Sequence, residues 1–468
     1  MNITRDGGKT WTNVSAAIPN LAAWGTVYSV EPSRYQAGTA YLTVDLHQEN
    51  NRDPFVYKTA DFGKTWKSIA GTLPTSILSY AHCIKEDPVR QGMLYLGVEN
   101  GLYVSFDDGE NWQPLQNNLP HVPVYGIAVQ EHFNDLVIAT YGRGFWILDD
   151  ITSLRNLQRT VLTSDAYLFP PRPAYRFRGR TPTLAQSYDP TAGQNPAYGA
   201  NIDYFLKSAP AEEVRLAILD AKGQTVRTIR GTQATGLNRV YWDLRYPPSS
   251  EIRLRTSPIY ASWLQPGPDG RPAGGNLAVL APPGMYTVKV MAGGQQLTQP
   301  LKVPKDPHSA GTEEDIRAQF AFVQSIRENL QGVGQMVNRL EMARRQLLDL
   351  GGSQPLLRNQ ANTLEQSLLH FEENLVQLKV SGGQDGMRWP ARLTAKLSHL
   401  ATEVQESDFA PTAQQNSVNQ QFTAQIRELR TGFDELINKG VVPFNGVLKE
   451  NGLPEIPIAV KPAGPAQQ

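Results

Sequence analysis

Short alternations of apolar and polar residues dominate the first third of the chain. Gly, Pro and Asn separate runs that are rich in β-branched and aromatic residues, at 26–30, 39–44, 93–98, 124–129 and 135–140. This pattern is typical of short strands joined by tight turns. Residues 1–157 are therefore predicted to form a series of small sheets.

The pattern changes after residue 157. Residues 158–200 are irregular and rich in Pro, Arg, Gly and Tyr, which predicts a long connector that lies over neighbouring domains. Strand-like runs return over 201–305, with Trp242 expected in their core, and indicate a small β-sandwich. A Pro- and Gly-rich insertion at 247–281 interrupts the sandwich and is expected to lie as a loop on another domain.

The last third has a helical period. Apolar residues recur every three or four positions in four stretches, at 316–340, 357–378, 393–404 and 418–436. Residues 312–315 resemble a capping box, and glycines at 351–352 and 382–383 mark expected breaks. The pattern predicts an antiparallel helical bundle over 306–452 and a loose tail over 453–468. No His or Glu-x-x-His recurs on the apolar stripes, so they are interpreted as core and no cofactor is predicted.

One motif occurs three times in the first quarter of the chain. Each copy has a hydroxyl residue, then an Asp, a Gly and a Trp at fixed spacing, and the tryptophans are 55 and 46 residues apart. The Asp can accept backbone N–H groups across a tight turn, the Gly takes a positive φ, and the Trp leads the next strand into a core. The spacing is close to the ~40–50 residues of one propeller blade. The copies are Asp6, Gly8 and Trp11; Asp61, Gly63 and Trp66; and Asp107, Gly109 and Trp112.

The motif resembles the Asp-box (BNR) repeat of sialidase-like and sortilin-like β-propellers, most closely that of large bacterial proteins labelled glycosyl hydrolase. The resemblance implies a partial propeller of about three blades over 1–157, with structural aspartates at its outer rim. Residues 140–150 look like a fourth, degenerate copy without the carboxylate. Residues 282–288 resemble a late strand of the immunoglobulin-like sandwich of the flagellar hook-capping family.

The same resemblance implies longer relatives with a signal peptide and further blades upstream. Residues 1–3 lead directly into the first box, so we expect an N-terminally truncated fragment whose propeller a missing N-terminal region or a partner chain completes. By resemblance we expect a secreted, periplasmic or cell-surface protein.

Composition excludes some partners. Lys plus Arg and Asp plus Glu are both 44, so no basic surplus indicates nucleic acid. No apolar run reaches the ~20 residues of a membrane helix, and no membrane span is predicted. The single cysteine, Cys83, is expected to be a buried and inert thiol.

A polar loop after the run 39–44 is the first candidate for binding. It holds Asp45, His47 and Asp53 and is longer than a hairpin requires. It also resembles the Asp-x-His and Asp-Pro-aromatic pattern of the propeller family. Asp45 and Asp53 would hold a cation or a sugar hydroxyl with help from His47, or these groups tie the loop by internal hydrogen bonds. No second His lies nearby, so no metal site is predicted.

Glu99 and Arg143 are the second candidate pair. They occupy corresponding turns of adjacent predicted blades and would converge on one polar ligand or pair with each other. A glycosidase needs two carboxylates ~5–10 Å apart, and Asp45, Asp53 and Glu99 are the candidates. The sequence does not supply the arginine cluster that a sialidase needs, because Arg143 is the only arginine with a supporting motif.

The sequence therefore predicts a multidomain protein, mainly β and then α: a partial Asp-box propeller, an immunoglobulin-like sandwich and a C-terminal helical bundle. Its predicted function is a secreted or surface scaffold whose propeller loops hold a glycan or a peptide. The alternative is a sialidase-like glycoside hydrolase acting through paired carboxylates. A third interpretation is a sortilin-like receptor that binds a peptide in the propeller tunnel.

Overall fold

The computed structural model describes residues 1–178, 193–382 and 384–457. The chain is mainly β-sheet and ends in a helical region. It divides into two compact units. Unit 1 comprises Met1–Pro170, Asp203–Ser208 and Thr235–Leu237, and unit 2 comprises Pro171–Ile202, Ala209–Ala234 and Asn238–Gln468. The domain boundaries expected from the sequence stay predictions, and parts of the expected connector and tail, at 179–192 and 458–468, lie outside the described residues.

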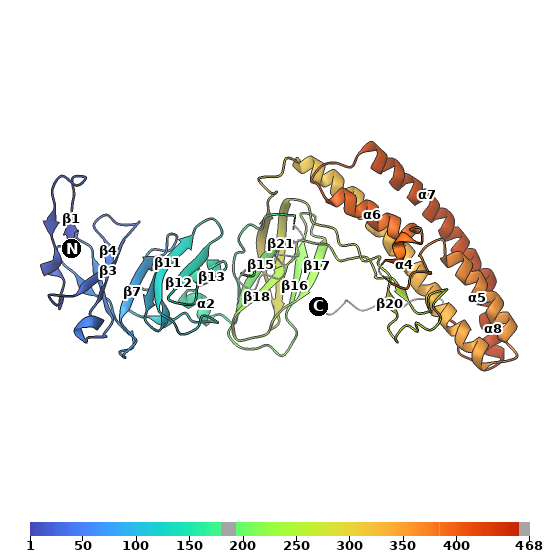
Figure 1. Cartoon of the computed structure of the whole chain (residues 1–468), viewed down its shortest axis with the longest axis horizontal. Helices are drawn as coiled ribbons and strands as arrows, with labels where there is room; N and C mark the ends of the chain where they lie inside the picture. The colour runs from blue at the N-terminus through green and yellow to red at the C-terminus, as the bar shows by residue number, and fades with distance from the viewer. Residues whose placement is uncertain (179–192, 383, 458–468) are drawn as a thin grey trace. The chain divides into compact units, whose positions relative to one another are not determined.

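Unit 1 is built from successive antiparallel sheets (Figure 1). A two-stranded sheet comes first, with β1 (Asn2–Ile3) and β2 (Thr12–Asn13). The second sheet, here called sheet A, has the order β3 (Thr26–Pro32), β4 (Ala40–Asp45), β5 (Phe55–Thr59) and β6 (Lys67–Ser68). Sheet B has the order β7 (Ala81–Glu86), β8 (Leu94–Val98), β9 (Gly101–Ser105) and β10 (Gln113–Pro114). Sheet C has three strands, β11 (Val124–Gln130), β12 (Asp135–Thr140) and β13 (Phe145–Leu148).

The first strands of sheets A, B and C are neighbours. Strand β7 lies beside both β3 and β11. The second strands β4 and β8 are almost entirely buried, because they have a strand on each side and another sheet against their faces. This is the blade-like arrangement expected from the sequence, but none of the sheets in the described part of the chain closes into a barrel.

All three boxes form the same turn. In the second box, Asp61 accepts hydrogen bonds from Thr65 N at 2.9 Å, from Thr65 Oγ1 at 2.7 Å and from Thr59 Oγ1 at 2.9 Å. Hydrogen bonds from Thr10 and Thr65 hold the pKa of the Asp6 and Asp61 carboxyls down at about 2. Gly63 takes φ 77°, as the turn requires. The equivalent contacts recur at 4–10 and 105–111.

The indoles of the boxes differ in burial. Trp66 and Trp112 are buried, and the Trp112 indole donates to Ile69 O at 2.8 Å. The expectation of a buried Trp is wrong for Trp11, which is 62% exposed because β1 and β2 form only a two-stranded sheet. The fourth copy expected at 140–150 is also wrong: its turn joins the second and third strands of sheet C, whereas the second and third boxes each follow the third strand of a sheet.

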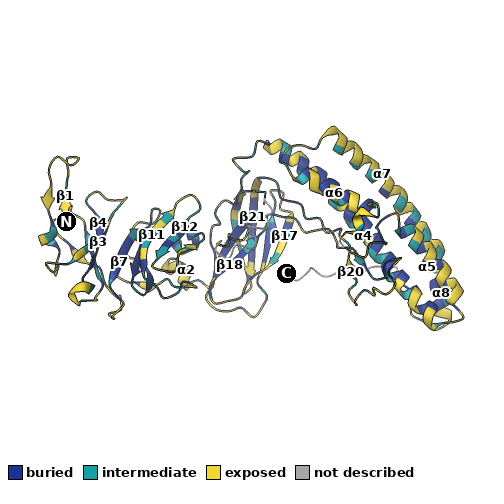
Figure 2. Cartoon of the chain, in the orientation of Figure 1, coloured by how far each residue is buried: buried dark blue, intermediate teal, exposed yellow. Residues whose placement is uncertain are grey.

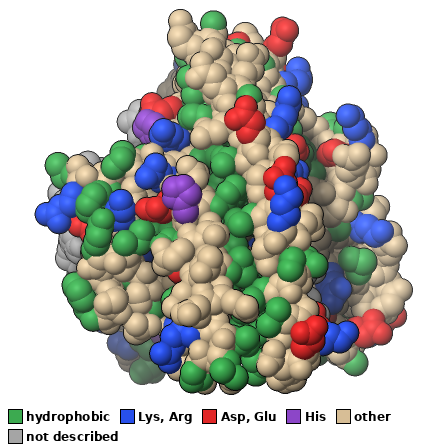
Figure 3. Space-filling model, turned by 90° about the vertical axis from the view of Figure 1, so that its right-hand side faces the viewer, with side chains coloured by type: hydrophobic (Ala, Val, Ile, Leu, Met, Phe, Trp, Pro, Cys, Tyr) green, Lys and Arg blue, Asp and Glu red, His purple; other side chains and the backbone are tan. Residues whose placement is uncertain are grey.

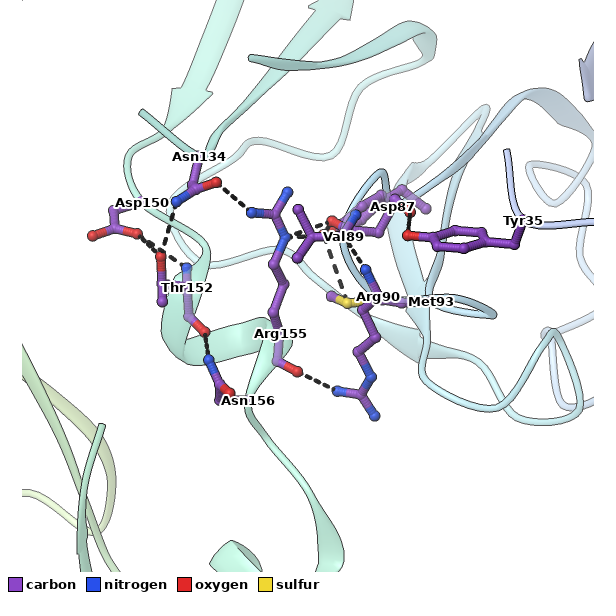
Figure 4. Close-up of polar contacts among 11 residues, drawn as sticks. Tyr35, Asp87, Val89, Arg90, Met93, Asn134, Asp150, Thr152, Arg155 and Asn156 are labelled. Atoms are coloured by element: carbon purple, nitrogen blue, oxygen red, sulfur yellow. Dashed lines mark hydrogen bonds and ion pairs between the residues drawn. The ribbon is translucent and has the colours of Figure 1, made fainter. Parts of the chain in front are cut away.

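A buried ion pair ties sheet B to the segment after sheet C (Figure 4). Arg155, on α1 (Thr152–Arg155), donates from Nε to both carboxylate oxygens of Asp87 at 2.9 Å. Asp87 also accepts from Tyr95 OH at 3.0 Å, and Arg155 donates to Asn134 as well. Arg90 in turn donates to the carbonyl of Arg155. These contacts lie at the ends of the strands where first and second strands connect.

After sheet C, unit 1 contains a further short helix. α2 (Arg159–Thr163) packs Val161 against Phe169 and Phe205. β14 (Ala166–Leu168), within the expected connector, pairs with the end of β15 (Ala200–Leu206).

Most of the remaining strands form two sheets. One has the order β14, β15 and β18 (Gly236–Trp242), and the other has the order β17 (Thr225–Arg230), β16 (Arg215–Leu219), β21 (Gly284–Ala292) and β22 (Gln295–Val303). Trp242 is fully buried and meets Tyr286 of β21 edge-on, with ring centroids 5.1 Å apart. The immunoglobulin-like topology expected here stays a prediction.

The helical region of unit 2 is organised around α4 (Glu313–Ser353). Thr312 begins it with a capping box in which Thr312 Oγ1 accepts from Asp315 N and Asp315 accepts from Thr312 N. The other helices are α5 (Arg358–Glu372), α6 (Leu393–Gln405), α7 (Ala413–Leu436) and α8 (Val442–Glu450), with a π-helical turn at Ile437–Val441. Figure 2 shows α7 largely exposed, whereas α4 has a buried side along much of its length. Leu375 and Leu378 are buried but follow the end of α5.

The insertion expected at 247–281 runs along α4 within unit 2. Backbone N–H groups of Ser250 and Arg253 donate to Gln331 and Asn338 at 2.7 and 2.8 Å. β19 (Arg253–Leu254) and β20 (Arg271–Pro272) form a two-stranded sheet in it. On the face that Figure 3 shows, positive and negative side chains are interspersed, in keeping with the equal numbers of acids and bases.

No helix among the described residues combines the length and the apolar character needed to cross a bilayer.

Candidate functional site

The same irregularity occurs near the start of the first strand in sheets A, B and C. In each strand the pairing with the second strand skips one residue, so a β-bulge forms there. The skipped residues are Tyr28, His82 and Tyr125. Because a bulge turns its side chain out of the regular alternation, bulges recur next to binding and catalytic sites.

The three bulged rings converge. The His82 ring stacks on Tyr125 with centroids 4.2 Å apart and an interplanar angle of 19°. Tyr28 meets His82 edge-on at 5.3 Å and Tyr125 at 5.8 Å. Three equivalent positions of three sheets therefore form one aromatic centre.

The loop between β4 and β5 adds a carboxylate and an imidazole. Asp45, the last residue of β4, accepts from His47 N at 2.9 Å and from His47 Nδ1 at 2.7 Å. The His47 ring stacks on Tyr80 at 4.9 Å, and Tyr80 meets His82 edge-on at 5.2 Å. The loop is thus tied to the aromatic centre by both ring contacts and hydrogen bonds.

The turn between β8 and β9 supplies the second carboxylate. Glu99 Oε2 lies 2.9 Å from His82 Nε2, and the Glu99 carboxylate adds to the burial that raises the pKa of Tyr80. With Nε2 donating to Glu99, the other ring nitrogen, Nδ1, is left as an acceptor. This atom is buried and has no hydrogen-bond partner among the described residues. An unpaired polar atom in a buried ring is costly and marks a site that deserves a functional explanation.

The turn between β12 and β13 completes the group with Tyr141, whose ring lies 5.7 Å from Tyr125. Tyr141 is 72% exposed, and Tyr28 and Tyr125 are each about 40% exposed. Trp24, 81% exposed, precedes β3, whose first residue pairs with Asp45. The aromatic–carboxylate cluster, as it is called below, consists of Tyr28, Asp45, His47, Tyr80, His82, Glu99, Tyr125 and Tyr141.

Burial and acidic neighbours govern the electrostatics of the cluster. Burial raises the pKa of Tyr28, Tyr80 and Tyr125. Glu99 and Asp45 add to the increase at Tyr80 and Tyr125, so both carboxylates influence the same two rings.

The residues expected from the sequence divide into two groups. Asp45, His47 and Glu99 come together in the cluster. Asp53 and Arg143 are exposed, and no hydrogen bond or ion pair joins either side chain to a described residue of the cluster. The expected alternative of a Glu99–Arg143 pair is wrong, since Glu99 pairs with His82.

Sequence reasoning missed the bulged rings. The sequence does contain a signal for these positions, namely an aromatic or imidazole ring between two small or β-branched residues. It occurs in Val27-Tyr28-Ser29, Ala81-His82-Cys83 and Val124-Tyr125-Gly126. It recurs once in each of the three sheets, at the same place in the strand.

The boxes lie at the other end of the strands. Thr59, which begins the second box, pairs with Ala40 at the start of β4, whereas Asp45 ends that strand. This position separates Asp61 from the cluster, and the pairing of Ser105 with Leu94 at the start of β8 does the same for Asp107.

Other chemistry is weakly represented. Cys83 is buried next to His82 in sequence, and burial raises the pKa of its thiol to about 12. The described residues contain no group of three or more His, Cys, Asp or Glu arranged to hold a metal ion. A cavity of about 40 Å³ is lined by residues that include Ser79 and Asn100, the sequence neighbours of Tyr80 and Glu99. It is far smaller than the ~300–1,000 Å³ of ordinary ligand pockets, so a ligand of the cluster would bind on exposed rings.

Comparison with known proteins gives little further information. No family model matches the chain, and no curated protein matches it. Solved structures that are similar to part of the chain include the two described here. An ancestral GH74 enzyme has 14% identity and a TM-score of 0.22, covering 62% of this chain and 34% of that one. The GH74 xyloglucanase from Xanthomonas campestris has 15% identity and a TM-score of 0.24, covering 62% and 49%. TM-scores this low carry no argument about function.

Proposed function

We propose that unit 1 is a glycan-binding scaffold and that the aromatic–carboxylate cluster is its binding face. The observation that carries this proposal is the convergence of three equivalent β-bulges, which present Tyr28, His82 and Tyr125 at one point. A structural core would bury these rings, yet both tyrosines are partly exposed. Clusters of exposed rings on a rigid sheet are interaction sites.

The chemistry of the cluster suits a sugar. The exposed faces of Tyr141, Tyr125 and Trp24 offer flat apolar surfaces for the C–H faces of a pyranose ring. Asp45 and Glu99 are acceptors for sugar hydroxyls, and each is held in place by an imidazole.

The test is binding of the whole chain to a glycan array, followed by titration of the best ligand. Trp24→Ala and Tyr141→Ala remove exposed rings and are expected to weaken binding about tenfold or more without changing the thermal unfolding temperature. Trp263→Ala, in unit 2, is the matched control, because this indole is 75% exposed and outside the cluster. Retention of peptides and of no glycan would contradict the proposal and favour a peptide receptor.

A glycoside hydrolase is the second candidate, favoured by the two carboxylates that influence the same tyrosines. Hydrolysis would require Asp45 and Glu99 to face one glycosidic bond. In that case Asp45→Asn and Glu99→Gln would abolish release of reducing sugar while ligand binding persists. A scaffold without turnover releases none before or after these substitutions.

Membership of the Asp-box propeller family and a secreted or surface location belong to the same proposal. The shared hydrogen-bond pattern of the three boxes supports the first. Fractionation of cells that make the full natural protein tests the second.

A further inference from the structure

We infer that the glycan recognised by the aromatic–carboxylate cluster carries positive charge, as the amino groups of a polymer of amino sugars do. This inference rests on the proposed function and narrows it to one chemical class. It also excludes the acidic sugars that a sialidase-like site would take.

The charged side chains of the cluster favour a cationic ligand. Its acidic side chains are Asp45 and Glu99, and no Lys or Arg forms an ion pair with either among the described residues. Their partners are imidazoles, His47 at 2.7 Å and His82 at 2.9 Å. The cluster thus holds two carboxylates and no permanently charged side chain to pair with them, so an ammonium group on the ligand would supply a permanent cation beside them.

The rings favour the same ligand. Tyrosine faces attract cations through their quadrupole, at distances up to about 6 Å from the ring centroid. Tyr28, Tyr125 and Tyr141 form a chain of ring contacts with exposed surface on each ring. An ammonium group bound there would meet ring faces and carboxylates together, whereas a carboxylated sugar would meet like charge.

The basic residues near these strands are occupied or separate. Lys85, further along β7, already pairs with Glu31 at 2.8 Å. Arg143 is exposed on the turn that follows Tyr141, and no described contact joins its guanidinium to the cluster.

Comparison with other tyrosines of unit 1 supports this reading. The charged neighbours that shift the pKa of Tyr80 are acids. By contrast, the acid Asp87 raises the pKa of Tyr95 while the cations Arg155 and Arg90 lower it. The cluster thus contains two acids and no Lys or Arg, in a chain whose total numbers of acids and of Lys plus Arg are equal.

The experiment compares three soluble oligosaccharides of equal length with the whole chain at mildly acidic pH, where glucosamine amino groups are protonated. The first is a fully deacetylated chito-oligosaccharide, which is cationic. The second is its acetylated form, which has the same linkage and is neutral. The third is an oligogalacturonate, which is anionic. Calorimetric titration is expected to show about tenfold tighter binding of the cationic form than of the neutral form, weakening as salt is raised.

Charge variants assign the preference to the cluster. Asp45→Asn and Glu99→Gln keep the size of each side chain and are expected to bring the ratio of cationic to neutral affinity close to one. Asp53→Asn is the matched control, because this carboxylate lies in the same loop and has no described contact with the cluster. It should leave the ratio unchanged.

The outcomes separate the two proposals. Equal binding of the neutral and cationic forms, or tighter binding of the anionic form, would overturn the charge inference and leave glycan binding standing. A preference that Asp53→Asn reduces as much as Glu99→Gln would also overturn it, since the charge would then act without the cluster. Binding of none of the three, together with an empty glycan array, would overturn the proposed function itself.

Discussion

At the residue scale, one motif has two energetic consequences. The three boxes share their hydrogen bonds, yet Trp112 and Trp66 are buried while Trp11 is exposed. The turn is specified locally by the Asp and the hydroxyl residue, because all their partners lie within four positions. The burial of the indole depends instead on the sheets around it. A motif can therefore guarantee a turn without guaranteeing a core.

Substitution of the indoles tests this distinction. Trp112→Ala is expected to lower the free energy of unfolding by about 3–5 kcal/mol, because it leaves a cavity against Ile69 and removes a hydrogen bond. Trp11→Ala is expected to change it by less than about 0.5 kcal/mol. Urea denaturation followed by circular dichroism measures both. Equal losses would contradict the view that the two boxes differ in packing.

The residues of the site show where prediction from sequence stops. Asp45, His47 and Glu99 could be predicted because they lie in polar turns after strands, where the chain has no core to build. Tyr28 and Tyr125 were assigned to ordinary strands, because an alternating pattern does not reveal where a bulge shifts the register. Asp53 was grouped with Asp45 by proximity in sequence, but the loop separates their side chains. Local chemistry was thus predictable, and the contacts made by register were not.

At the element scale, α4 and α5 share a group of buried charged side chains, here called the Arg344 cluster. The apolar periodicity of the two helices does not predict it. Arg344 contacts Glu341, Glu365 and Glu372, each at 2.9 Å, and all four side chains are buried. Backbone N–H groups of Arg255 and Thr256, from the insertion, donate to Glu341. The helix stripes were predictable from apolar spacing, whereas this cluster was not, because Glu and Arg at helical spacing usually mark a solvated face.

The Arg344 cluster makes the stability of unit 2 depend on pH. Burial, and then the Glu341 carboxylate, raise the pKa of Glu372 well above its ordinary value, so the folded state binds a proton that the unfolded state releases. The stabilisation from this proton is complete below the unfolded pKa of about 4.3 and is lost as pH rises through the folded pKa. Glu372→Gln mimics the protonated acid and is expected to remove this loss.

The measurement is the unfolding temperature of wild type and variant between acidic and mildly alkaline pH. The wild type is expected to lose stability relative to Glu372→Gln by up to about 1.4 kcal/mol per pH unit within that window. Glu403→Gln, at an exposed position of α6, is the control and should follow the wild type. A difference between Glu372→Gln and wild type that does not vary with pH would show that Glu372 does not hold the proton.

At the scale of the whole molecule, long-range polar contacts decide which sheets stay together. Arg155 and Asp87 are 68 positions apart in the chain, and their ion pair joins the segment after sheet C to sheet B (Figure 4). The strand-like runs of sheets A, B and C were predictable from local patterns in the sequence. No local pattern marks Arg155 as the partner of Asp87, because that choice depends on how the sheets lie against each other.

Breaking this pair should destabilise unit 1 far more than breaking a surface pair. Arg155→Met leaves the Asp87 carboxylate buried without its cation, and we expect a loss of about 3–5 kcal/mol in the free energy of unfolding. The double variant Asp87→Asn with Arg155→Met removes the stranded charge and is expected to recover part of that loss. Arg34→Ala breaks the exposed Arg34–Glu131 pair and should cost no more than about 1 kcal/mol. Urea denaturation of all three variants gives these values. If Arg155→Met and Arg34→Ala cost the same, the buried pair contributes no more than a surface contact, and apolar packing alone must hold sheets B and C together.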